Sequence, residues 1–219
     1  MLPGPVALIV DDHPLFCDAL ALTLRNVAGF SGVEAVHRLT AALARLDAGL
    51  RPDVVVLDLD LPDVDGMDGL LRMHAATSAP VMVVSSMADD RLVAAALAAG
   101  AAGFVPKHSG REVFRAAFQA MARGERWLPE GYTPPAPGAA TAGEEAVARL
   151  AQLTRQQARI LELICQGMLN KQIAFDLSIA ETTVKAHVTA IMRKLGVQSR
   201  TQAVLIAQQA RFSSLMPEG

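Results

Sequence analysis

The sequence predicts an α/β domain followed by a small all-α domain. Before residue 129, short apolar runs alternate with helical patterns, which is typical of repeated βα units in a doubly wound parallel sheet. From Pro129 to Gly143, proline and glycine recur without any hydrophobic period, as in a linker. Only helical periods follow Leu153, and the 219 residues are enough for two ordinary domains.

The elements of the first domain follow from these patterns. Strands are predicted near residues 6–10, 33–37, 53–57, 80–84 and 102–105, and helices near 14–28, 40–49, 66–76, 89–99 and 110–124. The runs 54–57 and 80–84 are apolar on both faces, as central strands covered by helices must be. Pro14 suits the first turn of a helix, and Gly100 is predicted to end the fourth helix.

Composition limits the class of protein. Hydrophobic residues make up 52% of the chain and aromatic residues only 4%, so the cores must consist mainly of Ala, Val, Leu and Ile. Cys17 and Cys165 lie far apart in apolar helical patterns, which favours two small buried side chains over a disulfide or a metal site. No apolar run reaches the roughly 18 residues of a membrane span. The first ten residues lack a signal-peptide pattern, so we expect a cytoplasmic protein without a membrane partner.

The charges are divided unevenly along the chain, although the net charge is only −2. Acidic residues outnumber basic ones before residue 129, and basic residues outnumber acidic ones after residue 149. A basic tail favours nucleic acid as a partner, but a basic face on a small helical unit is also common as a solvated surface.

Carboxylates follow two of the predicted strands. Asp11 and Asp12 end the run 6–10, and Asp58 ends the run 54–57. If these strands are parallel neighbours, the three acids meet at one edge of the sheet, where open α/β sheets place their ligands. Clustered carboxylates repel one another unless a hard cation neutralises them, so the pattern indicates an ion site.

Two further polar residues make the pattern specific. Ser85 follows the fourth strand and Lys107 follows the fifth. With Asp11-Asp12 and Asp58, they resemble the receiver domain of bacterial two-component response regulators. The resemblance implies a flavodoxin-like fold over residues 1–126, with a five-stranded parallel sheet in the order 2-1-3-4-5.

The same resemblance implies the chemistry. Asp58 would be the phosphoacceptor for a partner histidine kinase, and Phe104 would be the switching aromatic residue. Ser85 and Lys107 would contact the phosphoryl group. The cofactor would be Mg²⁺, and its ligands would be Asp11, Asp12, Asp58 and the backbone carbonyl of Asp60.

Each residue also has a simpler interpretation. An isolated aspartate after a strand is usually a turn former or a helix cap, and the side chains of Asp60, Asp63 and Asp65 are assigned to a solvated, turn-forming loop. The run around Asp58 and Asp60 also resembles the start of haloacid-dehalogenase phosphatases. However, two βα units precede this run and Leu61-Pro62 follows it, which departs from that family. We therefore expect a regulator and not an enzyme.

The tail contains four predicted helices, near residues 155–166, 170–177, 181–195 and 200–209, with Thr154 as a cap and Gly167 and Gly196 as stops. Their short turns suggest a helix-turn-helix. The third helix has one apolar face and one polar face of modest positive charge that fits a major groove. The apolar face comprises Val184, Val188, Ile191 and Leu195; the polar face comprises Thr182, Lys185, Thr189 and Arg193. By this pattern alone, an ordinary amphipathic helix is the better interpretation.

Longer motifs favour DNA binding. The stretches Leu153–Arg155, 167–174, 183–188 and 194–203, with their Asn-Lys, Thr-Val-Lys and Lys-Leu-Gly elements, resemble the LuxR-type DNA-binding domain. The whole chain then resembles a NarL/FixJ-type response regulator, with a flexible linker over 127–149 and a helix-turn-helix domain over 150–215. Double-stranded DNA is the implied partner, with a homodimer as the active form and RNA polymerase as a further candidate partner.

The resemblance assigns roles to the residues of the tail. Lys185, Ala186 and Thr189 would read base edges. Phosphate contacts would come from Asn170, Lys171, Thr182, Thr183, His187, Arg193, Lys194 and Arg200. The last helix, with Ala203, Val204, Ile206 and Ala207, would form the dimer contact or pack against its own domain. Three departures from the family are Gln157, where an acid is usual, Ala180, where the usual Ser or Thr would provide an N-cap hydroxyl, and the pair Ala186 and Thr189, which makes the polar face small and only mildly basic. A module that binds only proteins remains an alternative.

Overall fold

The structure is a computed structural model that describes residues 4–27, 29–64, 67–136 and 141–212. Its sheet consists of β1 (Val6–Val10), β2 (Gly32–Val36), β3 (Val54–Asp58), β4 (Val81–Ser85) and β5 (Gly103–Pro106). All neighbouring strands are parallel, in the order β2-β1-β3-β4-β5. The predicted fold and strand order are therefore confirmed, and the strand bounds shift by one residue or less.

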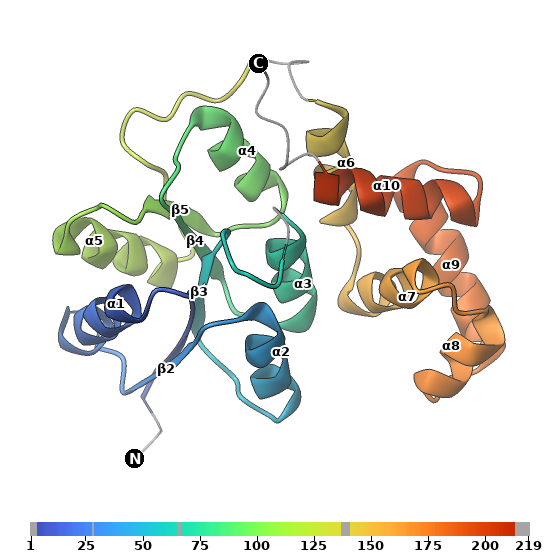
Figure 1. The fold of residues 1–219 in the computed structure, drawn as a ribbon, viewed down its shortest axis with the longest axis horizontal. Helices are drawn as coiled ribbons and strands as arrows, with labels where there is room; N and C mark the ends of the chain where they lie inside the picture. Colours follow the sequence, from blue (N-terminus) through green and yellow to red (C-terminus); the bar gives the residue numbers. More distant parts are fainter. Residues whose placement is uncertain (1–3, 28, 65–66, 137–140, 213–219) are drawn as a thin grey trace.

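Helices cover both faces of this sheet (Figure 1). One face carries α1 (Pro14–Val27) and α5 (Arg111–Ala122), and the other carries α2 (Leu39–Asp47), α3 (Asp68–Ala76) and α4 (Asp90–Ala98). Successive strand residues point to opposite faces, so Ala7 and Ile9 join the core below α1 and α5, whereas Leu8 and Val10 join the core below α2, α3 and α4. This alternation explains why β1 is apolar throughout, and why β3 and β4 are apolar up to their last residues, Asp58 and Ser85.

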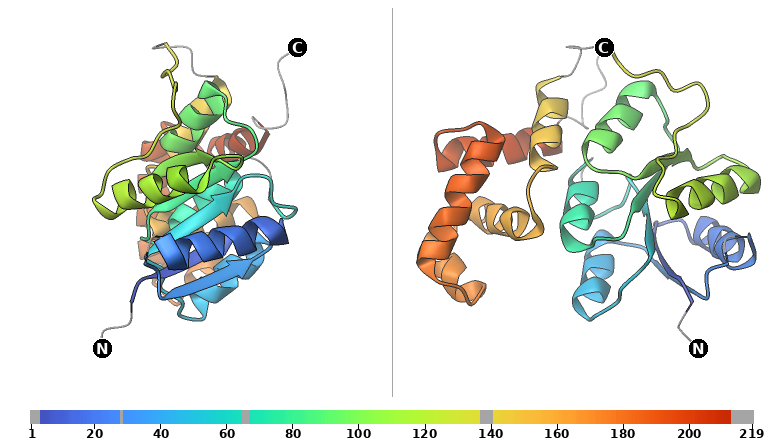
Figure 2. Two further views of the ribbon diagram at one scale, coloured as in Figure 1. Left: turned by 90° about the vertical axis from the view of Figure 1, so that its left-hand side faces the viewer. Right: turned by 180° about the vertical axis from the view of Figure 1, so that it is seen from behind.

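The C-terminal part is entirely helical. It comprises α6 (Ala142–Leu150), α7 (Arg155–Cys165), α8 (Asn170–Asp176), α9 (Glu181–Leu195) and α10 (Arg200–Phe212). Thr154 caps α7 as predicted, and its hydroxyl accepts a hydrogen bond from the N–H of Gln157. Gly196 ends α9 in the left-handed conformation, with φ of 69°, which glycine adopts without a steric penalty. Helices α8 and α9 form the helix-turn-helix (Figure 2).

The end of the predicted linker is a helix, α6, and not a flexible segment. A flexible segment was predicted over residues 127–149, but residues from Ala142 onward form a capped helix, and residues 137–140 lie outside the described chain. The Thr141 hydroxyl accepts from the N–H of Glu144, and the Glu144 carboxylate accepts from the N–H of Thr141. This Thr-x-x-Glu capping box was visible in the sequence, but the preceding proline and glycine residues obscured it.

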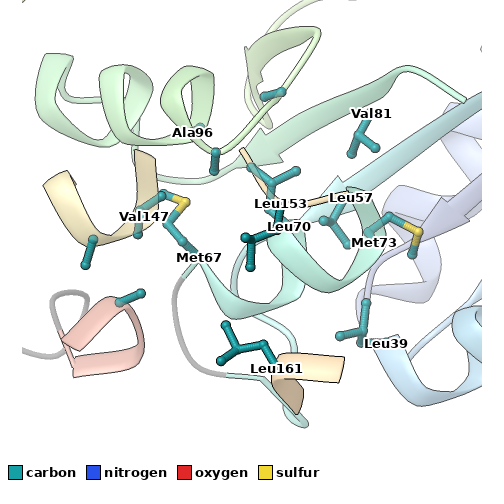
Figure 3. Packing of buried hydrophobic residues seen from close by; sticks show 14 of the residues in the cluster. Leu39, Leu57, Met67, Leu70, Met73, Val81, Ala96, Val147, Leu153 and Leu161 are labelled. Carbon is teal, nitrogen blue, oxygen red and sulfur yellow. The ribbon is translucent and has the colours of Figure 1, made fainter. Parts of the chain in front are cut away.

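The C-terminal helices pack against the helices on one face of the sheet. Helix α6 lies against α4, and α7 lies against α3 (Figure 1). Figure 3 shows Val147 of α6 beside Met67, and Leu153 and Leu161 near Leu70. These side chains are all buried in one continuous apolar cluster, which therefore includes residues of both domains.

A cavity of about 600 Å³ lies beside this interface, between α2 and α3 on one side and α7 and α10 on the other. No helix within the described ranges is both long enough and apolar enough to cross a membrane.

Candidate functional site

The predicted site residues gather at the carboxyl edge of the sheet. Asp11 follows β1, Asp58 ends β3, Ser85 ends β4 and Lys107 follows β5. Because β3 pairs with β1 on one side and with β4 on the other, these strand ends are adjacent. Asp11 is completely buried and Asp58 is only 1% exposed, so both carboxylates depend on partners within the protein.

Lys107 is the cation of this site. Its Nζ lies 2.7 Å from Asp58 Oδ2 and 2.8 Å from Asp11 Oδ2. The same Nζ lies 5.3 Å from the centre of the Phe16 ring, which adds a cation–π contact. The backbone N–H of Lys107 donates to the carbonyl of Ser85 at 2.8 Å, so the end of β4 fixes the position of the lysine.

The local environment shifts the pKa of both partners. Burial raises the pKa of Asp58 above its ordinary value, although the hydrogen bond from Lys107 opposes this rise. Burial also disfavours the charged lysine, but its hydrogen bonds to Asp11 and Asp58 outweigh this effect and raise the pKa of Lys107. The ammonium group is therefore held in its charged form beside the carboxylates.

His13, which is not among the predicted site residues, also belongs to the acidic group. Its Nδ1 lies 2.8 Å from Asp12 Oδ1 and 3.1 Å from Asp11 Oδ1. Ligand atoms of Asp11, Asp12, His13 and Asp58 all lie within 4.8 Å of one another. The position of His13 directly after the pair Asp11-Asp12 in the sequence was a signal for this role.

The donor set fits a hard divalent cation. Three carboxylates share one ammonium group and one imidazole, so a further positive charge would relieve their repulsion. Carboxylate oxygens are the ligands that Mg²⁺ prefers. The N–H of Asp60 donates to Asp58 Oδ1 at 3.2 Å, which keeps the backbone of Asp60 beside the cluster.

Ser85 and Phe104 are both buried near this edge. Ser85 is 2% exposed, and its Oγ accepts a hydrogen bond from the N–H of Met87 at 3.2 Å. Phe104 is completely buried in the core on the α4 side, and its N–H donates to the carbonyl of Trp127 at 3.0 Å. The Phe104 ring therefore points into the core below α4 and away from solvent.

The polar face of α9 is open to solvent. The predicted base-reading residues Lys185, Ala186 and Thr189 are all exposed, whereas Val184 and Ile191 on the opposite face are buried. Lys185 pairs with Glu181 at 2.9 Å within the helix. Of the predicted phosphate contacts, Lys171, Thr182, Thr183 and Arg193 are exposed, and His187 is half-buried.

Three predicted phosphate contacts have partners inside the domain. Lys194 Nζ donates to the carbonyl of Gln152 and to Oε1 of Gln157, both at 2.8 Å. Arg200 donates to Asn170 Oδ1 at 3.3 Å and also to the carbonyl of Met168. Lys194 therefore ties α9 to α7, and Arg200 ties α10 to α8, so any phosphate contact would have to share these bonds.

Comparison with known proteins identifies both halves. Residues 7–119 match the response regulator receiver domain, and residues 151–207 match the bacterial regulatory proteins of the luxR family. The chain is similar to the glycerol metabolism activator of Pseudomonas putida, with 38% identity over 95% of this chain and 97% of the relative. It is also similar to the nitrate/nitrite response regulator NarL of Escherichia coli, with 31% identity over 94% and 95% of the two chains.

The chain belongs to the NarL/FixJ-type response regulators. A solved structure of the RcsB response regulator from Salmonella typhimurium shares its fold, with a TM-score of 0.54 and 22% identity over 94% of this chain and 99% of that one. The alternative of a haloacid-dehalogenase phosphatase finds no support in these matches. Because residues 151–207 match the luxR family, the chain is a DNA-binding regulator of transcription. The alternative of a module that binds only proteins is therefore rejected.

In this response regulator, two of the three departures from the family pattern have visible consequences. Gln157 is buried and still bonds Lys194 through Oε1, so a neutral amide occupies the place of the usual acid. Ala180 is the N-cap residue of α9 and provides no side-chain cap bond. In α10, Ala203 and Ile206 are buried within the chain's own domain, which favours the packing alternative for these two residues.

Proposed function

We propose that phosphoryl transfer to Asp58 from a partner histidine kinase controls how this regulator binds DNA. The observation that carries the proposal is the ion pair of Lys107 with both Asp58 and Asp11 at the carboxyl edge of the sheet. Formation of an acyl phosphate on Asp58 would bring further negative charge to the carboxylate. A cation held beside the buried aspartate offsets this charge.

The step is an in-line displacement. A carboxylate oxygen of Asp58 attacks the phosphorus of a phosphohistidine, the N–P bond breaks, and the imidazole leaves with the bonding electrons. Asp11, Asp12, Asp58 and the carbonyl of Asp60 would hold Mg²⁺, which offsets the charge that accumulates on the phosphoryl oxygens. Lys107 would move from the carboxylate to a phosphoryl oxygen.

Ser85 would transmit the change to the core. Its hydroxyl now accepts from the N–H of Met87, and a phosphoryl group on Asp58 offers a charged acceptor to which the hydroxyl can donate instead. Movement of Ser85 and the loop after β4 would free space for Phe104 to rotate. This loop leads into α4, which contacts α6, so the change reaches the interface between the domains.

DNA would be bound by two copies of the chain. Lys185 and Thr189 offer hydrogen bonds to base edges, and the Ala186 methyl group can contact a thymine methyl group. Exposed Lys171, Thr182, Thr183 and Arg193 would contact phosphates, with Asn170, His187, Lys194 and Arg200 as further candidates. A dimer would place two α9 helices on half-sites about one DNA turn apart. With DNA as partner, we expect a cytoplasmic protein; RNA polymerase is a further candidate partner.

Phosphate uptake tests the proposal directly. We expect the wild-type chain to incorporate phosphate from acetyl phosphate in the presence of Mg²⁺, as a shifted band on a phosphate-affinity gel, and Asp58→Asn to incorporate none. Asp53→Asn is the matched control, because Asp53 lies at the opposite end of β3. Equal incorporation by Asp58→Asn and wild type would refute the assignment of the phosphoacceptor.

DNA selection tests the output. Bound sequences are selected from random DNA by the chain with and without acetyl phosphate, and phosphorylation is expected to strengthen the binding of a two-part site. Lys185→Ala is expected to relax specificity at one position of each half-site. An equal loss of binding on all DNAs would instead make Lys185 a phosphate contact.

A further inference from the structure

One short segment joins the two loops that carry the carboxylates. His37 follows β2, and its Nδ1–H donates to the backbone carbonyl of Asp11 at 2.9 Å. Three residues further on, the N–H and the hydroxyl of Thr40 donate to Asp63 at 2.9 and 2.8 Å. The segment 37–40 therefore contacts the loop after β1 at one end and the loop after β3 at the other.

Asp63 acts as a cap for a helix to which it does not belong. Arg38 stands at the N-cap of α2 without a side-chain cap bond, and the Asp63 carboxylate takes this place by accepting from the N–H groups of Leu39 and Thr40. Burial alone would raise the pKa of Asp63, but these hydrogen bonds outweigh it and lower the pKa. The prediction of a merely solvated loop residue is wrong for Asp63.

The loop between Asp58 and Asp63 is short and held at several points. The Asp60 N–H bonds the Asp58 carboxylate, Leu61 is only 3% exposed, and the N–H of Val64 donates to the carbonyl of Leu61 at 3.3 Å. A shift of Asp63 is therefore transmitted to the backbone of Asp60, because few free torsions lie between them.

We propose that Asp63 and His37 are positioning residues, which set the spacing between Asp11 and the loop that carries Asp58 and Asp60. This inference rests on the proposed function, since it concerns how the same pocket holds Mg²⁺. Mg²⁺ tolerates little departure from octahedral geometry, so ligands on separate loops need a fixed separation. The segment 37–40 connects those loops on the side of the sheet that carries α2.

The test compares two aspartates that both accept backbone hydrogen bonds. Asp63→Ala removes the cap, whereas Asp53→Ala removes the bond from the N–H of Val6, 2.7 Å long, at the opposite end of the sheet. Isothermal titration with Mg²⁺ alone measures affinity, and urea unfolding measures the loss of stability in each variant. We expect Asp63→Ala to bind Mg²⁺ about tenfold more weakly than Asp53→Ala, in line with other residues that orient metal ligands.

A second readout separates positioning from general damage. The rate of phosphorylation by acetyl phosphate is measured against Mg²⁺ concentration. Asp63→Ala is expected to need about tenfold more Mg²⁺ for half its maximal rate and to approach the wild-type rate at saturation. His37→Ala is expected to act in the same direction. If Asp63→Ala fails to fold, Asp63→Asn, which keeps one acceptor oxygen, replaces it.

Two results would count against the inference, and they differ in what they imply for the proposed function. Equal Mg²⁺ affinities for Asp63→Ala and Asp53→Ala, with a wild-type chain that binds Mg²⁺ and accepts phosphate, would overturn this inference and leave the proposed function intact. A wild-type chain that neither binds Mg²⁺ nor accepts phosphate would overturn both.

Discussion

The ammonium group of Lys107 lies 2.7 Å from the carboxylate of Asp58, and the same ammonium reaches Asp11. Both carboxylates are almost completely buried, so this single cation offsets two charges that water cannot reach. The stability of the first domain should therefore depend on the occupant of position 107.

Lys107→Met should lower stability at neutral pH by about 3 kcal/mol, because it leaves buried carboxylates without their cation. The pKa of Asp58, which burial already raises, should rise further. A carboxyl group whose pKa is higher in the folded protein than in the unfolded chain binds its proton more tightly when folded. Its cost to the stability of the protein therefore grows as pH rises through these two pKa values. Urea unfolding should therefore show a smaller loss at pH 5 than at pH 7.5. Arg126→Met, at an exposed position, is the control, and an equal loss at both pH values would contradict the explanation.

Asp63→Asn should reduce stability at pH 7 by about 1 kcal/mol, because the amide keeps one acceptor oxygen but loses the second one and the negative charge at the start of α2. The pKa of Asp63 is lowered in the folded protein, so its contribution is present above the unfolded value and is lost as pH falls through the folded value. The difference between Asp63→Asn and wild type should therefore shrink below about pH 4, near the ordinary pKa of an aspartate. Urea midpoints between pH 3 and 7 measure this, and a difference independent of pH would exclude a role for the charge.

Gln157→Glu should stabilise the C-terminal domain by about 1 kcal/mol, because an ion pair with Lys194 replaces a hydrogen bond from the ammonium group to a neutral amide oxygen. The carboxylate would also retain the capping box with Thr154. Gln156→Glu is the matched control, since it places the same charge in the same helical turn on an exposed side chain. Thermal unfolding of both variants gives the comparison, and equal shifts would assign the whole effect to the helix dipole.

Ala180→Ser should also stabilise this domain, by about 1 kcal/mol, because Ala180 at the N-cap of α9 offers no side-chain acceptor to the first N–H groups of the helix. The extended backbone of Ala180 already has the conformation that a capping serine needs. An unchanged or lower urea midpoint would show that water or another group already satisfies these donors.

The two cysteines should differ in their reaction with iodoacetamide. Burial, followed by the nearby charge of Asp11, raises the pKa of the Cys17 thiol to about 11, so little reactive thiolate forms at pH 8. Cys165 is only half-buried and should be alkylated first. Mass spectrometry of partly labelled protein measures the order, and faster labelling at Cys17 would contradict this environment.

Most of the fold could be predicted because its signals are local. Runs of four apolar residues in β3 and β4, separated by an amphipathic helix, favour a covered parallel sheet. The acids and Lys107 could be selected because each directly follows a strand, and parallel topology brings strand ends together. Helix α6 was missed because its capping box follows residues rich in proline and glycine, where the local signal for a loop is stronger.

Other features depend on contacts between distant parts of the chain. Asp63 caps α2 across 24 positions of sequence, and Lys194 bonds Gln157 across 37. The sequence by itself determined the two domains and the acids that follow the strands, because periodicity and strand-end position are properties of neighbouring residues. The strand order came from the resemblance of these motifs to receiver domains. Only the tertiary structure decided which carboxylate Lys107 approaches, what Asp63 binds and where α6 packs, since these depend on the distances that folding creates between remote side chains.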